Sequence, residues 1–248
     1  MNKTYVWGIP TRIFHWMFAI AIVAAYTLSE DAINWHVTLG MTALLLAFFR
    51  IIYGFLGPRY SNFRDFPISI SKIKHFLKVE RKSPLPSAGH HPLASLIMIL
   101  ILVMMLLVPF SGMLALGQEF DSGLFVGSSL INLTEWKEVH ELCVNGLIAL
   151  VIIHLLGLAA DWRAHAQHAS WKSMFTGYKT GINEEDVKLN LFQKVYSLVW
   201  FLIPFSFFLF SVNNPPVSEA VLQQIEEYEH ASGDGEQGED EHETDDED

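Results

Sequence analysis

The sequence has a single cysteine, Cys143, among its 248 residues. One cysteine cannot form an internal disulfide, a CxxCH attachment site for a c-type haem, or a cysteine cluster for zinc or an iron–sulfur centre. The chain also lacks an internal repeat and a glycine-rich phosphate loop. Any metal or redox chemistry in this chain must therefore use histidine, of which there are 11.

Charged residues are scarce as well. Only 17% of the residues are charged whereas 51% are hydrophobic, and the chain includes 18 Phe and 7 Trp, which is too apolar for a soluble domain of this size. The net charge of −11 arises from one region, because residues 213–248 contain 14 Asp and Glu and no Lys or Arg. The remainder carries 16 − 13 = +3. This composition indicates a membrane protein, with no expectation of a nucleic-acid partner.

The apolar residues fall into runs long enough to cross about 30 Å of hydrocarbon. These predicted transmembrane helices are residues 11–29, 36–56, 93–116, 138–160 and 195–212. We therefore expect an all-α integral membrane helix bundle, in which residues 1–194 form a four-helix domain and 195–212 add a fifth helix. The fifth run is the shortest and contains Pro204, which neighbouring helices can accommodate.

The basic residues predict the orientation, since short loops rich in Lys and Arg stay in the cytoplasm. With a cytoplasmic N-terminus, 15 of the 16 Lys and Arg residues lie at cytoplasmic ends and loops, and only Lys137 lies outside. We therefore expect residues 213–248 to emerge on the outer face, which is the periplasm in a bacterial inner membrane.

Histidines recur at matched depths in these helices. In HELCVNGLIALVIIH, residues 140–154, the two histidines are 14 positions apart. On a helix this separation is about 21 Å and roughly 40° short of four turns, so His140 and His154 share one face. His15 lies one turn into the first helix from the cytoplasm, and His36 begins the second helix at the outer surface. The topology predicts an outer pair, His36 with His140, and an inner pair, His15 with His154.

Such pairs are typical of b-type haem ligation, in which two neutral histidines face each other across a bundle interior. Two stacked haem irons, one held by each pair, would carry electrons across the membrane. A single histidine near a helix end is commonly an interfacial polar residue. Four at matched depths favour a functional role, because ionisable residues inside a membrane are costly. His90 and His91, just before Pro92, are interpreted as helix-capping residues.

Four further residues are candidates for haem contacts. Arg50 is 14 positions after His36, so it should point at the inner haem, where its planar fork matches a propionate carboxylate. Arg12, one turn before His15, is a second candidate; for both arginines the alternative is snorkelling to the cytoplasmic boundary. Gly40, like Gly157, could leave room for a porphyrin face or allow close helix packing.

Several motifs together resemble a known family over about residues 5–180. They are WGIPTRIFHW near the start, the histidine of the second helix with Gly40 and Arg50 behind it, GHHPLA, and the H-x13-H pattern. The chain resembles the bacterial cytochrome b561 family and the b-type cytochrome subunits of nickel–iron hydrogenases. The resemblance implies two b-type haems ligated by His15 with His154 and by His36 with His140. It also implies electron exchange between membrane quinone, near the inner haem, and a periplasmic hydrogenase, another reductase or a c-type cytochrome.

We therefore expect a lipid-embedded dihaem cytochrome b of a respiratory chain, with quinone as its exchangeable substrate and no catalytic side chain assigned. One alternative is a non-catalytic membrane anchor and electron conduit for a partner enzyme. Another is a histidine-lined transporter for metal ions or protons.

The acidic region 213–248 lies outside the shared motifs. It is predicted to begin with a short amphipathic helix after the proline pair and to be disordered over 233–248. It is either a solubilising tail or an electrostatic landing site for a basic donor.

Overall fold

A computed structural model describes residues 2–28, 32–78, 89–164, 170–223 and 227. The described part is an all-α bundle, which confirms the predicted fold class. It contains five helices that are long and apolar enough to cross a membrane: α1 (Ile9–Thr27), α2 (Ile33–Leu56), α4 (Pro92–Phe120), α5 (Trp136–Ala164) and α7 (Leu191–Asn213).

Local sequence signals explain where two helices begin. α1 starts at Ile9, before the predicted residue 11, because Pro10 is well tolerated in a first helical turn, where its missing N–H has no helical acceptor. α7 starts at Leu191, before the predicted residue 195. The cause is a capping box, in which the Asn190 side chain accepts from the Gln193 N–H and the Gln193 side chain accepts from the Asn190 N–H.

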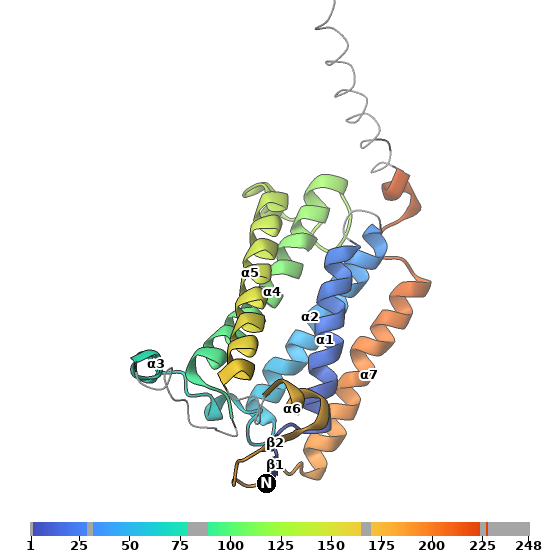
Figure 1. Cartoon of the computed structure of the whole chain (residues 1–248). Coiled ribbons are helices and arrows are strands. Elements are labelled where there is room, and N and C mark those ends of the chain that lie inside the picture. Colours follow the sequence, from blue (N-terminus) through green and yellow to red (C-terminus); the bar gives the residue numbers. More distant parts are fainter. Residues whose placement is uncertain (1, 29–31, 79–88, 165–169, 224–226, 228–248) are drawn as a thin grey trace, which may run out of the picture.

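The helices form two groups that meet through α2 (Figure 1). α4 packs along α5, while α1 and α7 both pack against α2. At the centre of the second group, Phe49 of α2 lies 5.0 Å from Phe201 of α7 and 5.9 Å from Phe14 of α1, measured between ring centroids. In a bilayer such close packing, more than exclusion from water, holds helices together.

The bundle has two distinct ends. The first, here called the strand end, carries β1 (Lys3–Tyr5) paired antiparallel with β2 (Tyr178–Thr180), with Thr4 opposite Lys179. It also carries η1 (Phe63–Asp65), α3 (Ile70–Lys78) and α6 (Ser170–Thr176). The opposite end, here called the far end, carries the loop between α4 and α5 with η3 (Ser129–Asn132). α1, α4 and α7 begin at the strand end, whereas α2 and α5 begin at the far end (Figure 1).

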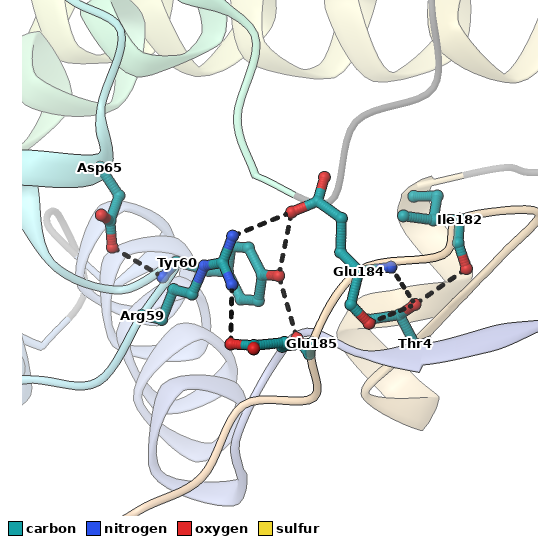
Figure 2. A network of polar contacts seen from close by, with 7 residues as sticks. All are labelled: Thr4, Arg59, Tyr60, Asp65, Ile182, Glu184 and Glu185. Carbon is teal, nitrogen blue, oxygen red and sulfur yellow. Dashed lines mark hydrogen bonds and ion pairs between the residues drawn. The ribbon is translucent and has the colours of Figure 1, made fainter.

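A polar network closes the strand end (Figure 2). The Tyr60 hydroxyl donates to Glu184 Oε2 (3.2 Å) and to the Glu185 carbonyl (3.0 Å), and Thr4 Oγ1 donates to the Ile182 carbonyl (2.9 Å). Arg59 bridges the two glutamates, but these ion pairs are exposed and contribute little. Burial and the nearby Glu184 carboxylate raise the pKa of Tyr60. The network fastens the segment before α7 to the N-terminal strand and to the loop after α2.

The segment after α7 is fastened at the far end. Val217 is buried, its N–H donates to Asn34 Oδ1 (2.8 Å), and its carbonyl accepts from Asn34 Nδ2 (3.3 Å). The chain is helical again over residues 219–223, where the helix after the proline pair is predicted. Residues 224–226 and 228 of that predicted helix, and all of 232–248, lie outside the described residues.

Candidate functional site

The far end brings together two of the predicted histidines. His36, in the first turn of α2, and His140, near the start of α5, lie with their ring centroids 6.1 Å apart and their planes at 86°. Both side chains are partly buried. The predicted outer pair is therefore close in space, although the two residues are more than a hundred positions apart in the chain.

Backbone carbonyls orient both rings. His36 Nδ1 lies 2.8 Å from the Ala25 carbonyl, and His140 Nδ1 lies 3.0 Å from the Val108 carbonyl. A carbonyl oxygen only accepts, so in each ring Nδ1 carries the proton and donates it. An imidazole protonated at Nδ1 alone keeps its lone pair on Nε2, which is the arrangement found in metal-binding histidines.

Gly112 of α4 provides the space in which the His140 ring lies. A Cβ at this position would lie 3.0 Å from His140 Cε1 and 3.1 Å from its Nδ1, which is tighter than ordinary van der Waals contact. The neighbouring Ser111 Oγ lies 3.3 Å from the same Nδ1. The α4 backbone therefore positions this imidazole by contact and by hydrogen bonding.

The strand end holds the other two histidines. His15 of α1 and His154 of α5 are close enough for their charges to interact, and both are partly buried. His15 Nδ1 is buried and has no hydrogen-bond partner among the residues that the structure describes. His154 follows His140 by 14 residues on α5, about 21 Å along the helix axis. The two pairs thus lie at two depths of one bundle.

Arg50 lies at the depth of the strand-end pair. Its side chain is only 8% exposed, and its guanidinium carbon is 4.9 Å from the Phe63 ring centroid and 5.8 Å from that of Phe66. Its Nη1 atom is buried without a hydrogen-bond partner in the described part of the chain. This guanidinium lies inside the protein. A snorkelling arginine would instead extend its guanidinium into water.

The other candidates differ in their surroundings. Arg12 Nη1 donates to the Phe175 carbonyl (2.6 Å), so this arginine ties α1 to α6, and the expected role at a haem stays a prediction. A Cβ at Gly40 or at Gly157 would meet no described atom within 4 Å. Neither glycine is therefore used for close helix packing in the described structure, and the expected room for a porphyrin face stays a prediction.

The sequence interpretation missed two residues at the strand end. The His90 ring lies between Trp7 and Phe66, with 4.8 Å between centroids in each case. Lys179 is 8% exposed, its Nζ donates to the Gly89 carbonyl (3.2 Å), and it lies 5.9 Å from the Trp7 ring centroid. Burial lowers the pKa of Lys179 to about 8. Burial also lowers the pKa of His90 well below its usual value, and the charges of Lys179 and Arg50 lower it further.

The capping role expected for His90 and His91 is wrong. His91 occupies the N-cap position of α4 but makes no side-chain capping hydrogen bond, and the His90 ring packs between two aromatic rings. The doubled histidine before a proline was a visible signal, but its partners come from distant segments. Lys179 gave no signal, because its burial depends on the pairing of β1 with β2.

The histidine pairs suit a haem iron, which takes two axial ligands from the protein. Among the described residues no group of three or more His, Cys, Asp and Glu side chains is arranged to hold a metal ion, but a haem needs only a pair. Two metal–imidazole bonds of about 2 Å each, plus the ring radii, place two ligating rings roughly 6 Å apart. The 6.1 Å between the His36 and His140 ring centroids agrees with this spacing.

Comparison with known proteins gives one match. The family model described as prokaryotic cytochrome b561 matches residues 6–177, which is more than half of the 248-residue chain. The match includes helices α1, α2, α4 and α5, and with them all four paired histidines and Arg50. Lys179, α7 and the acidic region lie after the matched residues. No curated protein and no solved structure matches.

Proposed function

Because the chain belongs to the prokaryotic cytochrome b561 family, we propose that it is a dihaem cytochrome b that carries electrons across the membrane between a periplasmic redox partner and quinone. Membership makes it a membrane b-type cytochrome of electron transfer, and the five apolar helices agree with this. The observation that best supports the finer proposal is the close pair His36 and His140, whose Nδ1 atoms are hydrogen-bonded to backbone carbonyls.

The protein residues would hold one haem at each end of the bundle. His36 and His140 would ligate the far-end haem through Nε2, and His15 and His154 the strand-end haem. A haem iron with both axial positions filled by histidine supplies reversible one-electron transfer and no open site for oxygen. The carbonyls of Ala25 and Val108 fix the tautomers at the far end. Gly40 and Gly157 would leave room for the macrocycle, since a Cβ at either position would meet no described atom within 4 Å.

The orientation follows from the charges at the two ends. The strand end includes most of the Lys and Arg residues, so we place it in the cytoplasm of a bacterial inner membrane. The described far end carries Lys137 together with several carboxylates: Glu119, Asp121, Glu135, Glu138 and Glu141. We assign the periplasmic partner, a hydrogenase, another reductase or a c-type cytochrome, to this acidic end. Quinone would exchange electrons near the strand-end haem.

A visible spectrum of the purified protein tests this function. Sharp reduced bands of b-type haem, with two haems per chain, support the cytochrome. A protein purified without haem from haem-replete membranes contradicts it and favours the histidine-lined transporter.

A second assay separates the relay from a passive conduit. The purified protein alone, mixed with a short-chain quinol, should become reduced at both haems, with quinol oxidation following the haem spectrum. Reduction that occurs only when the partner enzyme is present would show a membrane anchor and conduit, with quinone chemistry located in the partner.

A further inference from the structure

Three nitrogen-bearing side chains converge at the strand end around shared aromatic rings. Phe66 contacts both His90 (4.8 Å between centroids) and the Arg50 guanidinium (5.8 Å). Trp7 contacts both His90 (4.8 Å) and the Lys179 ammonium (5.9 Å). His90 therefore shares one aromatic partner with each cation. These five residues are here called the His90 cluster.

The charges of this cluster call for an anion. Arg50 and Lys179 are each only 8% exposed, and a buried charge is costly unless it is paired and hydrogen-bonded. Lys179 interacts with Asp161 and Glu184 and donates to the Gly89 carbonyl. Arg50 presents a buried Nη1 that has no hydrogen-bond partner among the described residues. An anionic acceptor at this position would accept a hydrogen bond from the Arg50 guanidinium and would also be attracted by the positive charge of Lys179.

The position of the cluster identifies that acceptor. His90 is close enough to His154 for their charges to interact, as it is to Arg50 and Lys179. The cluster thus borders the strand-end histidine pair. A haem carries two propionate carboxylates on one edge of its ring, and planar carboxylates are the preferred partners of a guanidinium fork.

We infer that Arg50, His90 and Lys179 together bind the propionate carboxylates of the strand-end haem, an inference that rests on the proposed function. Arg50 donates from Nη1, and His90 donates from a ring N–H. Lys179 supplies positive charge and, through the Gly89 carbonyl, holds the turn that carries His90 in front of α4. Trp7 and Phe66 fix the plane of the His90 ring by packing against it. Lys179 lies after the residues that the family model matches, so its role here is supported only by its contacts in the structure.

The test uses the full-length holoprotein with Lys179→Met and His90→Leu, and measures haem content, redox titrations and resonance Raman propionate bands. Both variants should lower the midpoint potential of the strand-end haem, because positive charge and hydrogen-bond donation to the propionates favour the reduced iron. The far-end haem should keep its potential. The strand-end component is identified as the one missing from the titration of His154→Ala.

Two controls separate propionate binding from a structural role. Lys188→Met removes an exposed lysine of the same end and should change neither potential nor Raman bands. His90→Asn retains an N–H donor and should return the potential toward that of the parent protein. If His90→Leu does not accumulate, the comparison of Lys179→Met with Lys188→Met still shows whether the cluster acts on the haem propionates.

The outcomes also separate this inference from the proposed function. Unchanged potentials and propionate bands in Lys179→Met, with two haems retained, overturn the inference and leave the dihaem function standing. Absence of haem from the parent protein overturns the proposed function itself.

Discussion

The ring centroids of His36 and His140 lie 6.1 Å apart with the ring planes at 86°, and each ring has its Nδ1 hydrogen-bonded to a backbone carbonyl. Two elements far apart in sequence, the start of α2 and the start of α5, therefore bring their imidazole rings together at the far end. This relationship can be perturbed without touching either histidine.

Gly112→Ala tests the contact that positions His140. The added Cβ would lie 3.0 Å from His140 Cε1, so the ring must move by a few tenths of an ångström. This movement would distort the hydrogen bond from His140 Nδ1 to the Val108 carbonyl. We expect an altered electron paramagnetic resonance signal of the far-end haem, because that signal depends on the relative orientation of the two axial rings.

Gly146→Ala is the matched control for that substitution. Its Cβ would also meet an atom at 3.0 Å, but that atom is the terminal methyl of Met104, which can move at little cost. Identical spectra for Gly112→Ala and the parent protein would show that His140 is not an axial ligand.

Arg50→Leu should keep the strand-end haem and lower its midpoint potential. Removing a nearby buried positive charge favours the oxidised iron, which carries the greater positive charge. Arg64→Leu, at an exposed position of the same end, should leave both potentials unchanged. A redox titration of the three proteins checks this, and an Arg50→Leu titration that overlays the parent would place the guanidinium away from the haem.

Tyr60→Phe should weaken the network at the strand end. The hydroxyl donates to Glu184 and to the Glu185 carbonyl, and Tyr60 is only 4% exposed, so its loss should lower the free energy of unfolding by about 1–2 kcal/mol. Urea titration in detergent micelles measures this change, with Tyr178→Phe at an exposed position as the control. Equal stabilities of the two variants would show that the network is not needed to hold the segment before α7.

Deletion of residues 232–248 tests whether the acidic region guides a basic electron donor. Haem content and potentials should stay the same, while reduction by the donor becomes slower at low ionic strength. The difference should shrink as salt screens the charges. Equal stopped-flow rates for full-length and shortened protein at low salt, measured with the physiological donor, would reduce the region to a solubilising tail.

The membrane helices were predictable because each is a long apolar run, and the paired histidines because 14 residues return to nearly the same helical face. Helix ends were less predictable, since they depend on Pro10 and on the Asn190 capping box. The Lys3–Tyr5 strand could not be predicted. Three residues are too few to show alternation, and the strand's partner lies more than 170 positions away.

The His90 cluster escaped prediction for the same physical reason. Its residues come from the N-terminal segment, α2, the loop after α2, the turn before α4 and β2, which only the folded strand end brings together. A histidine next to a proline suggests a cap when it is read locally. Its burial between Trp7 and Phe66 is a tertiary property that no local pattern contains.

The haem content of three purified proteins tests the central claim most directly. If two histidine pairs hold two haems at two depths, the pyridine haemochrome assay should give two haems per chain for the parent protein and about one for either His140→Ala or His154→Ala. The haem lost should differ between the two variants, so their redox titrations should retain complementary components. Two haems with unchanged titrations in both variants would contradict the ligand assignment, and with it this account of the electron path.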